Sequence, residues 1–271
     1  MIKQAIIPLA GLGTRLLPLT SVMPKELLPI NGKPNLEYIM DECIEAGIRH
    51  FIFIISKEKS SIKKYFFNDS FYKKIIKKKK DKRIIEEFRK IKKYQKMIKF
   101  VYQNKPKGTG DAVLKCQKLI KNKFFLMLLP DDLIIKKNCT KEMLKLHYKT
   151  KGSILATKKV DIKTVSRWGI LSIKKKYKNY FRIKDVVEKP NIKKAPSNYA
   201  IIGRYILPIA IFDEIKKLRP SHGKEIHITD AIKNLIFKNY DFFGNIFKGK
   251  YLDCGTINGY IQSSIQIFKG N

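Results

Sequence analysis

Short apolar runs alternate with amphipathic segments along this sequence, and that alternation limits its fold more than any other feature. Runs of strand length occupy residues 5–9, 51–55, 98–102 and 124–129. Between the first two runs, residues 35–45 carry apolar side chains at the spacing of one helix face. Alternating strands and helices are typical of α/β proteins, so we predict a sandwich of helices around a mainly parallel sheet.

The same pattern continues through the rest of the 271-residue chain. Further strands are predicted at residues 153–158, 168–173, 183–187 and 198–207. Further helices are predicted at residues 109–119, 141–148, 210–217, 229–238 and 258–268. The Lys-rich residues 71–99 stand apart as a predicted surface segment of one or two helices. Because no linker or internal repeat interrupts the chain, we expect residues 1–271 to form a single domain.

The net charge is extreme: 58 Lys and Arg oppose 23 Asp and Glu, which gives +35. Such a charge is typical of nucleic-acid-binding proteins. The chain is also rich in Lys, Ile, Asn, Phe and Tyr, however, and this composition indicates mutational bias toward A/T-rich codons. Lys far outnumbers Arg, although Arg pairs better with phosphate, and no aromatic residues interleave with the lysines at 77–80. We therefore expect no specific nucleic-acid partner.

Cysteine and histidine provide no framework for disulfides or zinc. The four cysteines form no Cys-x-x-Cys pair, and the four histidines lack the spacing of metal ligands. No uncharged apolar stretch reaches the ~18 residues of a membrane-spanning helix, so no membrane partner is expected. The N-terminus lacks a signal-peptide pattern, and we expect a cytoplasmic protein.

Two closely spaced glycines follow the first predicted strand, in Ala10-Gly11-Leu12-Gly13-Thr14-Arg15. A second motif, Pro24-Lys25-Glu26-Leu27-Leu28-Pro29, comes shortly afterwards. Glycine lets backbone N–H groups approach an anion, and Arg15 and Lys25 supply positive charge. The loop is neither a Walker A motif nor a dinucleotide fingerprint, because Gly-Lys-Ser/Thr and a third glycine are absent. We interpret the two motifs together as a polyphosphate site.

Carboxylates follow two later strands, at the strand ends where α/β sheets bind ligands. Asp131 and Asp132 come after the apolar run at 124–128, and Glu188-Lys189 ends the strand at 183–187. Mg²⁺ usually takes one or two carboxylates together with substrate phosphates, so Asp131 is a predicted ligand and Asp253 a second one. Lys189 could bind another phosphate, and Glu188 could accept hydrogen bonds from hydroxyl groups.

Motifs for several other kinds of catalysis are missing from the sequence. It contains no Gly-x-Ser-x-Gly elbow, no His-Glu-x-x-His motif and no obvious Cys/His pair. These absences disfavour nucleophilic hydrolysis and zinc chemistry. A phosphate-binding loop, several cations and strand-end carboxylates remain, and that set suits metal-assisted phosphoryl or nucleotidyl transfer.

In their order along nearly the whole chain, these motifs resemble those of the bacterial UTP–glucose-1-phosphate uridylyltransferases. The resemblance starts with Ile7–Arg15 and residues 24–29 and closes with Gly259-Tyr260. Between them come Lys33-Pro34, residues 42–47, Gln103, Lys107-Gly108, Leu129-Pro130-Asp131, Trp168-Gly169, residues 187–190, Pro196-Ser197-Asn198, Gly203-Arg204-Tyr205, Glu225-Ile226, residues 229–232 and Asp253-Cys254-Gly255. The family implies a Rossmann-like nucleotidyltransferase fold: a three-layer sandwich with a mixed, mostly parallel central sheet.

The resemblance also implies a reaction and a set of roles. UTP and α-D-glucose 1-phosphate would give UDP-glucose and pyrophosphate, with Mg²⁺ as cofactor and a homodimer or homotetramer as the assembly. Catalytic roles would fall to Arg15, Lys25 and Lys189. Nucleotide-binding roles would fall to Ala10, Gly11, Gly13, Thr14, Glu26, Gln103 and Gly108. Gly169, Glu188, Lys189 and Gly203 would bind the sugar phosphate, and Asp131 and Asp253 would bind the metal.

Three positions depart from the family pattern. Ser21 stands where a lysine is common, Asp111 where a histidine is usual, and Trp168 where a tyrosine precedes the glycine. Because the loop and metal motifs are intact, we expect an active enzyme rather than an inactive regulatory relative. The departures concern substrate affinity and how sharply the base is recognised.

Other readings of the sequence make different substrate predictions. A thymidylyl- or adenylyltransferase would share the glycine loop and a downstream Lys-Pro. The sequences Lys25-Glu26-Leu27-Leu28-Pro29 and Asp253-Cys254-Gly255 favour the uridylyl branch instead. A basic nucleic-acid-binding protein is the alternative from another class, and it would predict stacking aromatics and a binding module.

Overall fold

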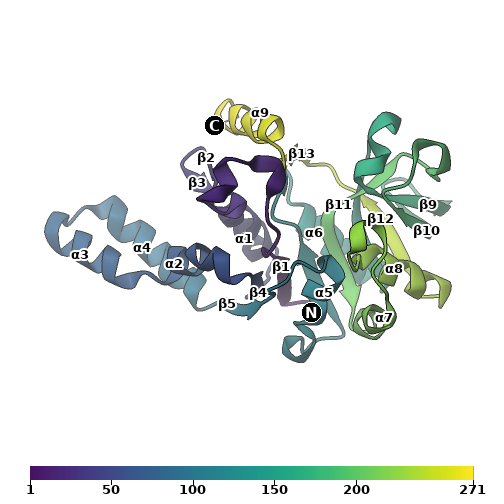
Figure 1. Cartoon of the computed structure of the whole chain (residues 1–271), viewed down its shortest axis with the longest axis horizontal. Helices are drawn as coiled ribbons and strands as arrows, with labels where there is room; N and C mark the ends of the chain where they lie inside the picture. The colour runs from purple at the N-terminus through teal and green to yellow at the C-terminus, as the bar shows by residue number, and fades with distance from the viewer. Residues whose placement is uncertain (271) are drawn as a thin grey trace.

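A mixed β-sheet forms the centre of the protein in our computed structural model, which describes residues 1–270 (Figure 1). Within these residues the sheet has nine strands. Their order is β5 (Ile98–Tyr102), β4 (His50–Ile55), β1 (Gln4–Pro8), β6 (Phe124–Leu128), β11 (Tyr199–Pro208), β8 (Ser153–Lys159), β12 (Phe242–Ile246), β10 (Tyr180–Glu188) and β9 (Gly169–Lys176). Seven of these described strands point the same way, and β11 and β10 run against them. This arrangement confirms the predicted mixed, mostly parallel sheet.

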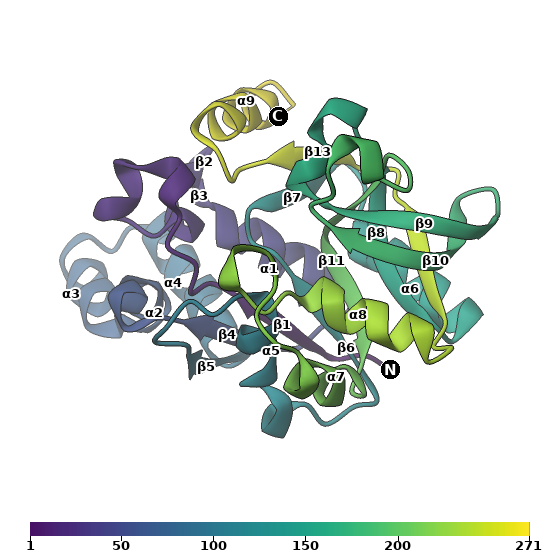
Figure 2. The same cartoon turned by 45° about the vertical axis from the view of Figure 1, so that its right-hand side comes forward.

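Side chains of the central strands alternate between two apolar cores, one on each face of the sheet. In β4, Phe51 and Phe53 belong to one core, and Ile52 and Ile54 belong to the other. The first core packs under α1 (Asn35–Glu45) and α6 (Cys139–Thr150). The second packs under α5 (Thr109–Leu114), α7 (Ile211–Lys217) and α8 (Ile228–Phe237), which lie together in front of the sheet in Figure 2. The predicted three-layer sandwich is therefore confirmed.

A small two-stranded sheet joins distant parts of the chain beside the central one. In it, β7 (Asp132–Ile135) pairs antiparallel with β13 (Lys250–Asp253), and Asp253 lies opposite Asp132. The short strands β2 (Pro29–Ile30) and β3 (Lys33–Pro34) form another pair, next to the C-terminal helix α9 (Ile257–Phe268). The β7–β13 pairing brings the two predicted metal-binding motifs together.

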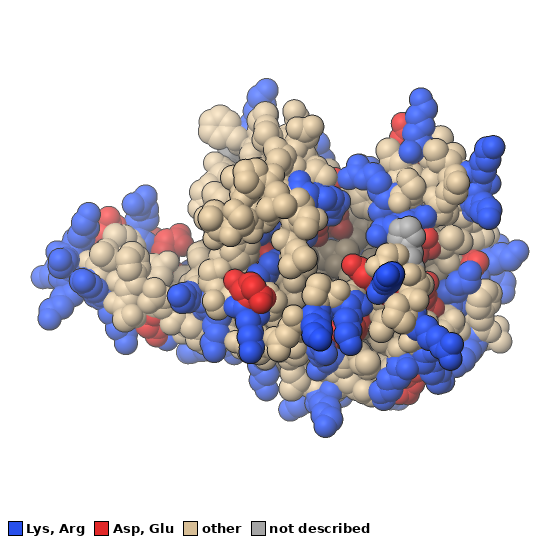
Figure 3. All heavy atoms as spheres, in the orientation of Figure 1, with Lys and Arg blue, Asp and Glu red and all other residues tan. Residues whose placement is uncertain are grey.

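Three helices leave the sheet and form an arm, at the left in Figure 1. They are α2 (Ser60–Phe67), α3 (Asp69–Lys79) and α4 (Lys82–Gln95). The arm contains the predicted Lys-rich helical segment at 71–99, whose last residues enter β5. Described residues of α3 include none that is buried, and Figure 3 shows Lys and Arg side chains spread over this arm. Among residues 1–270, no helix combines the length and apolar character needed to cross a bilayer.

A fully buried arginine ties four elements together behind the strand ends. Arg204 of β11 donates from Nε to Glu42 Oε1 of α1 at 3.0 Å, and from a terminal nitrogen to the backbone oxygen of Asp132. The same Glu42 oxygen accepts from the backbone N–H of Thr140 at 3.0 Å and from its hydroxyl at 2.7 Å. Helix α6 and the start of β7 are thereby fixed to β11 and α1.

We predict that Arg204→Met lowers the free energy of unfolding by about 3–5 kcal/mol, because it leaves the Glu42 carboxylate buried without a counter-charge. Urea denaturation measures this loss. Lys216→Met serves as the control, since its ion pair with Asp213 is exposed and should contribute less than about 1 kcal/mol. The double variant Arg204→Met/Glu42→Leu should recover part of the loss. Equal free energies of unfolding for Arg204→Met and Lys216→Met would show that the buried ion pair contributes no more to stability than the exposed one.

Candidate active site

Two adjoining cavities open at the carboxyl ends of the parallel strands, where α/β proteins bind ligands. We call them the Gln103 cavity, of about 310 Å³, and the Lys189 cavity, of about 270 Å³. They share five lining residues, namely Arg15, Thr109, Leu129, Asp131 and Glu225. The two cavities therefore form one cleft whose halves meet at Arg15 and Asp131.

The Gln103 cavity has an uncharged end and a charged end. Small residues surround the uncharged end: Ala10 and Gly11 follow β1, and Pro106 and Gly108 follow β5. Gln103, the residue after β5, adds a buried amide there. Arg15 and Lys25 line the other end, beside Asp131. A ligand with a flat uncharged part and an anionic tail would match this division.

The cations of the charged end are paired with Asp131. Lys25 Nζ lies 2.8 Å from Asp131 Oδ2, and an Arg15 nitrogen lies 3.5 Å from the same oxygen. Burial alone would lower the pKa of Lys25, but Asp131 and Glu26 outweigh it and raise this pKa above its ordinary value. Burial likewise opposes ionisation of Asp131, yet Lys25 holds the pKa of that carboxyl below its usual range. The site therefore keeps a charged lysine beside a charged carboxylate.

Glu26, a predicted nucleotide-binding residue, has a side chain that is already occupied. It is fully buried, and Lys59 Nζ lies 2.8 Å from each of its carboxylate oxygens. Burial raises the pKa of Glu26, although Lys59 and Lys25 oppose this shift. Glu26 lines the Gln103 cavity, but its carboxylate anchors the loop of residues 24–29 to the segment after β4.

Two carboxylates converge near Gly255. A Cβ atom placed on Gly255 would lie 2.8 Å from Asp131 Oδ2 and 3.2 Å from Asp253 Oδ1. An Arg167 nitrogen lies 2.9 Å from the second oxygen of Asp253. Residues 1–270 include no cluster of three or more His, Cys, Asp or Glu arranged for a metal. Two carboxylates nevertheless fit a hard cation that takes its other ligands from substrate phosphates and water.

A third carboxylate lies behind this pair. Tyr251 donates its hydroxyl hydrogen to Asp132 Oδ1 at 2.7 Å. Burial and the adjacent Asp131 raise the pKa of Asp132 to about 7. Asp132 was not assigned a role from the sequence, and its position directly after Asp131 was the signal that could have identified it.

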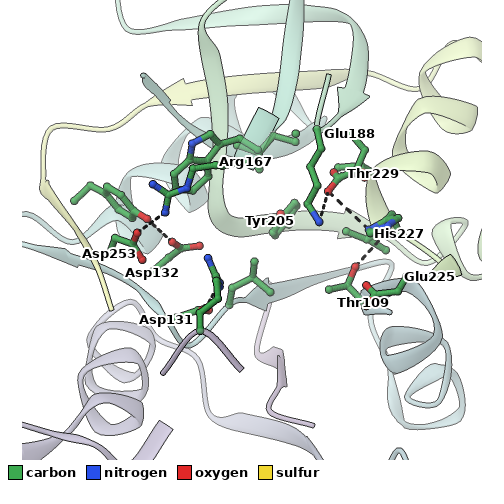
Figure 4. Close-up of a pocket in the computed structure, with 18 residues that line it drawn as sticks. Thr109, Asp131, Asp132, Arg167, Glu188, Tyr205, Glu225, His227, Thr229 and Asp253 are labelled. Atoms are coloured by element: carbon green, nitrogen blue, oxygen red, sulfur yellow. Dashed lines mark hydrogen bonds and ion pairs between the residues drawn. The ribbon is translucent and has the colours of Figure 1, made fainter. Parts of the chain in front are cut away.

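The Lys189 cavity has a carboxylate opposite the three aspartates (Figure 4). Glu188 Oε2 accepts a hydrogen bond from the Thr229 hydroxyl at 2.7 Å. Lys189 Nζ lies 3.9 Å from Glu188 Oε1, and His227 Nδ1 lies 3.8 Å from that oxygen. Gly169 lines the wall, where a Cβ atom would lie 3.3 Å from Glu188 Oε2. This half of the cleft offers hydroxyl-binding groups, and the cations that line it are Lys189, Arg167 and the shared Arg15.

A backbone contact joins the two halves. The N–H of Ile226 donates to Lys107 at 2.9 Å, and the N–H of Gly110 donates to Ile226 at 2.8 Å. The approach is so close that a Cβ atom on Gly108 would lie 2.6 Å from the Ile226 oxygen. We call residues 107–110 and 225–228 the strap. Thr109 and His227 belong to the strap, and Thr229 follows it; all three line the Lys189 cavity. None of them was assigned a role from the sequence, although Thr229 lies in the motif at residues 229–232.

Three predicted site residues line neither cavity among the described residues; they are Gly13, Thr14 and Gly203. Gly13 has φ +72° at the turn before Thr14, and the Thr20 hydroxyl donates to the Gly13 oxygen at 2.9 Å. Gly203 has φ +33°, and a Cβ atom there would lie 2.2 Å from Asp132 Oδ2. Gly203 thus makes room for the side chain of Asp132, which lines the Lys189 cavity. The other predicted residues all line the cleft.

The site combines a glycine loop with cations that lie beside a pair of strand-end carboxylates. On a mixed, mostly parallel sheet of this kind, that combination defines a nucleotidyltransferase. The nucleotidyl transferase family pattern matches residues 4–270. UTP–glucose-1-phosphate uridylyltransferase 1 of Staphylococcus saprophyticus is 37% identical over 266 residues, which cover 98% of this chain and 92% of that protein. The chain belongs to the nucleotidyl transferase family and, within it, to the UTP–glucose-1-phosphate uridylyltransferases.

Solved structures agree with this assignment. A UDP-glucose pyrophosphorylase complexed with UDP-glucose has a TM-score of 0.88 and 36% identity, with 100% of both chains covered. A UTP-bound UGPase from Acinetobacter baumannii has a TM-score of 0.89 and 29% identity, with 98% of this chain and 93% of that chain covered. The similarity therefore extends over the whole fold rather than over one motif.

Proposed function

We propose that this protein transfers the uridylyl group of UTP to α-D-glucose 1-phosphate and releases pyrophosphate. The observation that carries this proposal is the junction of the two cavities at Arg15 and Asp131. One cavity suits a base and its phosphates, and the other suits a polyhydroxyl ligand with one phosphate. The anionic groups of both substrates would meet at that junction.

Each half of the cleft has a proposed ligand. Uracil lies against Ala10, Gly11, Gln103 and Gly108, and the triphosphate extends toward Arg15 and Lys25. Glu26 positions the loop that carries Lys25, and Gly13 and Thr14 shape the turn before Arg15. Glucose lies against Gly169 and Glu188, with Gly203 behind them, and Lys189 contacts its phosphate.

The reaction is proposed to be a direct displacement. A phosphate oxygen of glucose 1-phosphate attacks the α-phosphorus of UTP in line, and a new P–O bond forms. The bond from the α-phosphorus to the bridging oxygen breaks, and pyrophosphate leaves with the electron pair. Two unit charges at 4 Å repel by about 4 kcal/mol at an effective dielectric constant of 20. Lys25 and Lys189 offset this repulsion and hold the two phosphates in line.

Nucleotidyltransferases of this kind use a divalent metal, and we propose Mg²⁺ held by Asp131 and Asp253. When bound, Mg²⁺ neutralises phosphate charge at the reacting centre. Arg15 and Lys25 contact Asp131 in the structure, and Arg167 contacts Asp253. These side chains balance the carboxylates while the metal is absent, and we propose that Arg15 and Lys25 contact the phosphates once Mg²⁺ binds there.

Assembly and location follow from the same proposal. We propose a single-domain protein that forms a homodimer or homotetramer. Helix α9 supports self-association, because it carries four exposed apolar residues at helical spacing: Ile257, Ile261, Ile265 and Phe268. Figure 3 shows a mostly uncharged surface over this helix. A cytoplasmic location fits the use of UTP.

A panel of nucleotides tests the function directly. Pyrophosphate release is measured with glucose 1-phosphate and UTP, dTTP, ATP or CTP in turn. We expect UTP to exceed ATP and CTP by about tenfold or more in kcat/KM, because the buried amide at Gln103 discriminates among bases. If dTTP is clearly the better substrate, the uridylyl assignment is wrong. If no nucleotide reacts, the protein is not a working transferase.

Lys189→Ala is predicted to lower kcat by about 100-fold, since it removes a cation placed at developing phosphate charge. Steady-state rates at saturating substrates measure the effect, and the thermal unfolding midpoint checks the fold. Lys193→Ala is the matched control, because Lys193 is exposed in the turn that follows and lines neither cavity. A near-wild-type rate for Lys189→Ala would remove Lys189 from the mechanism.

Gly255→Ala is predicted to raise the half-saturating Mg²⁺ concentration by about 10- to 100-fold. The added methyl group would lie within van der Waals distance of both Asp131 and Asp253 and push them apart. Asp253→Asn should produce a similar rise without adding volume. Rates are measured across a Mg²⁺ titration after chelation of bound metal. Unchanged Mg²⁺ dependence in both variants would exclude Asp253 from the metal site.

A further inference from the structure

Asp111 lies in the first turn of α5 and contacts the side chain at the uncharged end of the Gln103 cavity. Gln103 Nε2 donates to Asp111 Oδ2 at 2.6 Å and to the backbone oxygen of Gly108 at 3.3 Å. Gln103 is 4% exposed, so its amide has little freedom to turn. The two donors of the amide nitrogen are thus both used inside the protein.

The chemistry of these partners determines which way the amide faces. A carboxylate oxygen and a backbone carbonyl oxygen can only accept hydrogen bonds. If the amide were flipped, its oxygen would face two other oxygens, and repulsion would replace two hydrogen bonds. No donor within residues 1–270 reaches Gln103 Oε1. That oxygen is therefore presented to the cavity as an acceptor.

Asp111 is itself held in place. Its other oxygen, Oδ1, lies 3.7 Å from Lys115 Nζ, one helical turn further along the chain. Its side chain is 15% exposed, whereas that of Lys115 is 38% exposed. The lysine lines neither cavity, so it can be altered without touching the cleft.

We propose that Asp111 is a positioning residue that makes Gln103 an obligate acceptor and so selects bases with a ring N–H donor. Uracil and thymine carry that N–H at N3, whereas the N3 atom of cytosine is an acceptor and would face Gln103 Oε1 without a hydrogen. This inference rests on the proposed function. It attributes discrimination against cytosine to Asp111, a residue that does not itself line the Gln103 cavity. It also predicts that Asp111 does not discriminate uracil from thymine.

The test uses Asp111→Asn in the full-length protein. An asparagine at this position can donate or accept, so the Gln103 amide is free to adopt either orientation. Dissociation constants for UDP, dTDP and CDP are measured by calorimetry, together with kcat/KM for UTP, dTTP and CTP. We expect the preference for UDP over CDP to fall by about tenfold, and the UDP-to-dTDP ratio to stay within about twofold.

Two further variants separate a positioning role from a structural one. Lys115→Met removes the other partner of Asp111 and should leave all three dissociation constants near their wild-type values. In a Gln103→Ala background, Asp111→Asn should have no further effect on the UDP-to-CDP ratio, because Asp111 acts through Gln103.

Other outcomes would overturn the inference. Equal weakening of UDP, dTDP and CDP by Asp111→Asn would show that Asp111 only supports the fold. An unchanged UDP-to-CDP ratio would show that the orientation of Gln103 is fixed by other contacts. Neither result bears on the proposed reaction, which fails only if the wild-type protein forms no UDP-glucose from UTP and glucose 1-phosphate.

Discussion

The contact between Arg204 and Glu42 is the constraint on which the rest of the site depends. Arg204 lies in β11, in the middle of the sheet, and its guanidinium contacts both α1 and the start of β7, directly after Asp131. A charge buried this deeply is stable only where every donor is matched by an acceptor. The hydrogen bonds of Arg204 to Glu42 fix the distance between α1 and β11. The bond to the backbone oxygen of Asp132 fixes the position of the strand-end carboxylates.

The charges in the cleft are paired, in contrast to the high net positive charge of the chain as a whole. Each cation near the reacting centre is paired with a carboxylate: Lys25 and Arg15 with Asp131, Arg167 with Asp253, and Lys189 with Glu188. The surface lysines give the protein its +35, but the cleft is close to balanced. A balanced site holds its side chains in defined positions before any substrate arrives, and this limits the reorganisation needed when phosphate charge enters.

Sequence patterns predicted the larger elements well and the connections between them poorly. Residues 35–45 and 98–102 coincide with α1 and β5, because long periodic or apolar segments carry a strong signal. The strands β7, β12 and β13 were not predicted, since each contains at most three apolar residues, whereas β5 contains four. The same limit applies to the cleft. Motifs located Asp131 and Lys189, whereas the place of Thr109 in the cleft depends on its contact with the backbone N–H of Ile228, 119 positions further along the chain.

The strap has a consequence for how such a cleft can change over time. Residues 107–110 border the end that we assign to the base, and residues 225–228 border the end that we assign to the sugar. Their backbones touch at Gly108, Gly110 and Ile226, where no side chain separates them. A substitution that displaces one strand of the strap must displace the other. Nucleotide preference and sugar preference therefore evolve together. A substitution in the strap that changes one preference also requires compensating changes at the other end of the cleft.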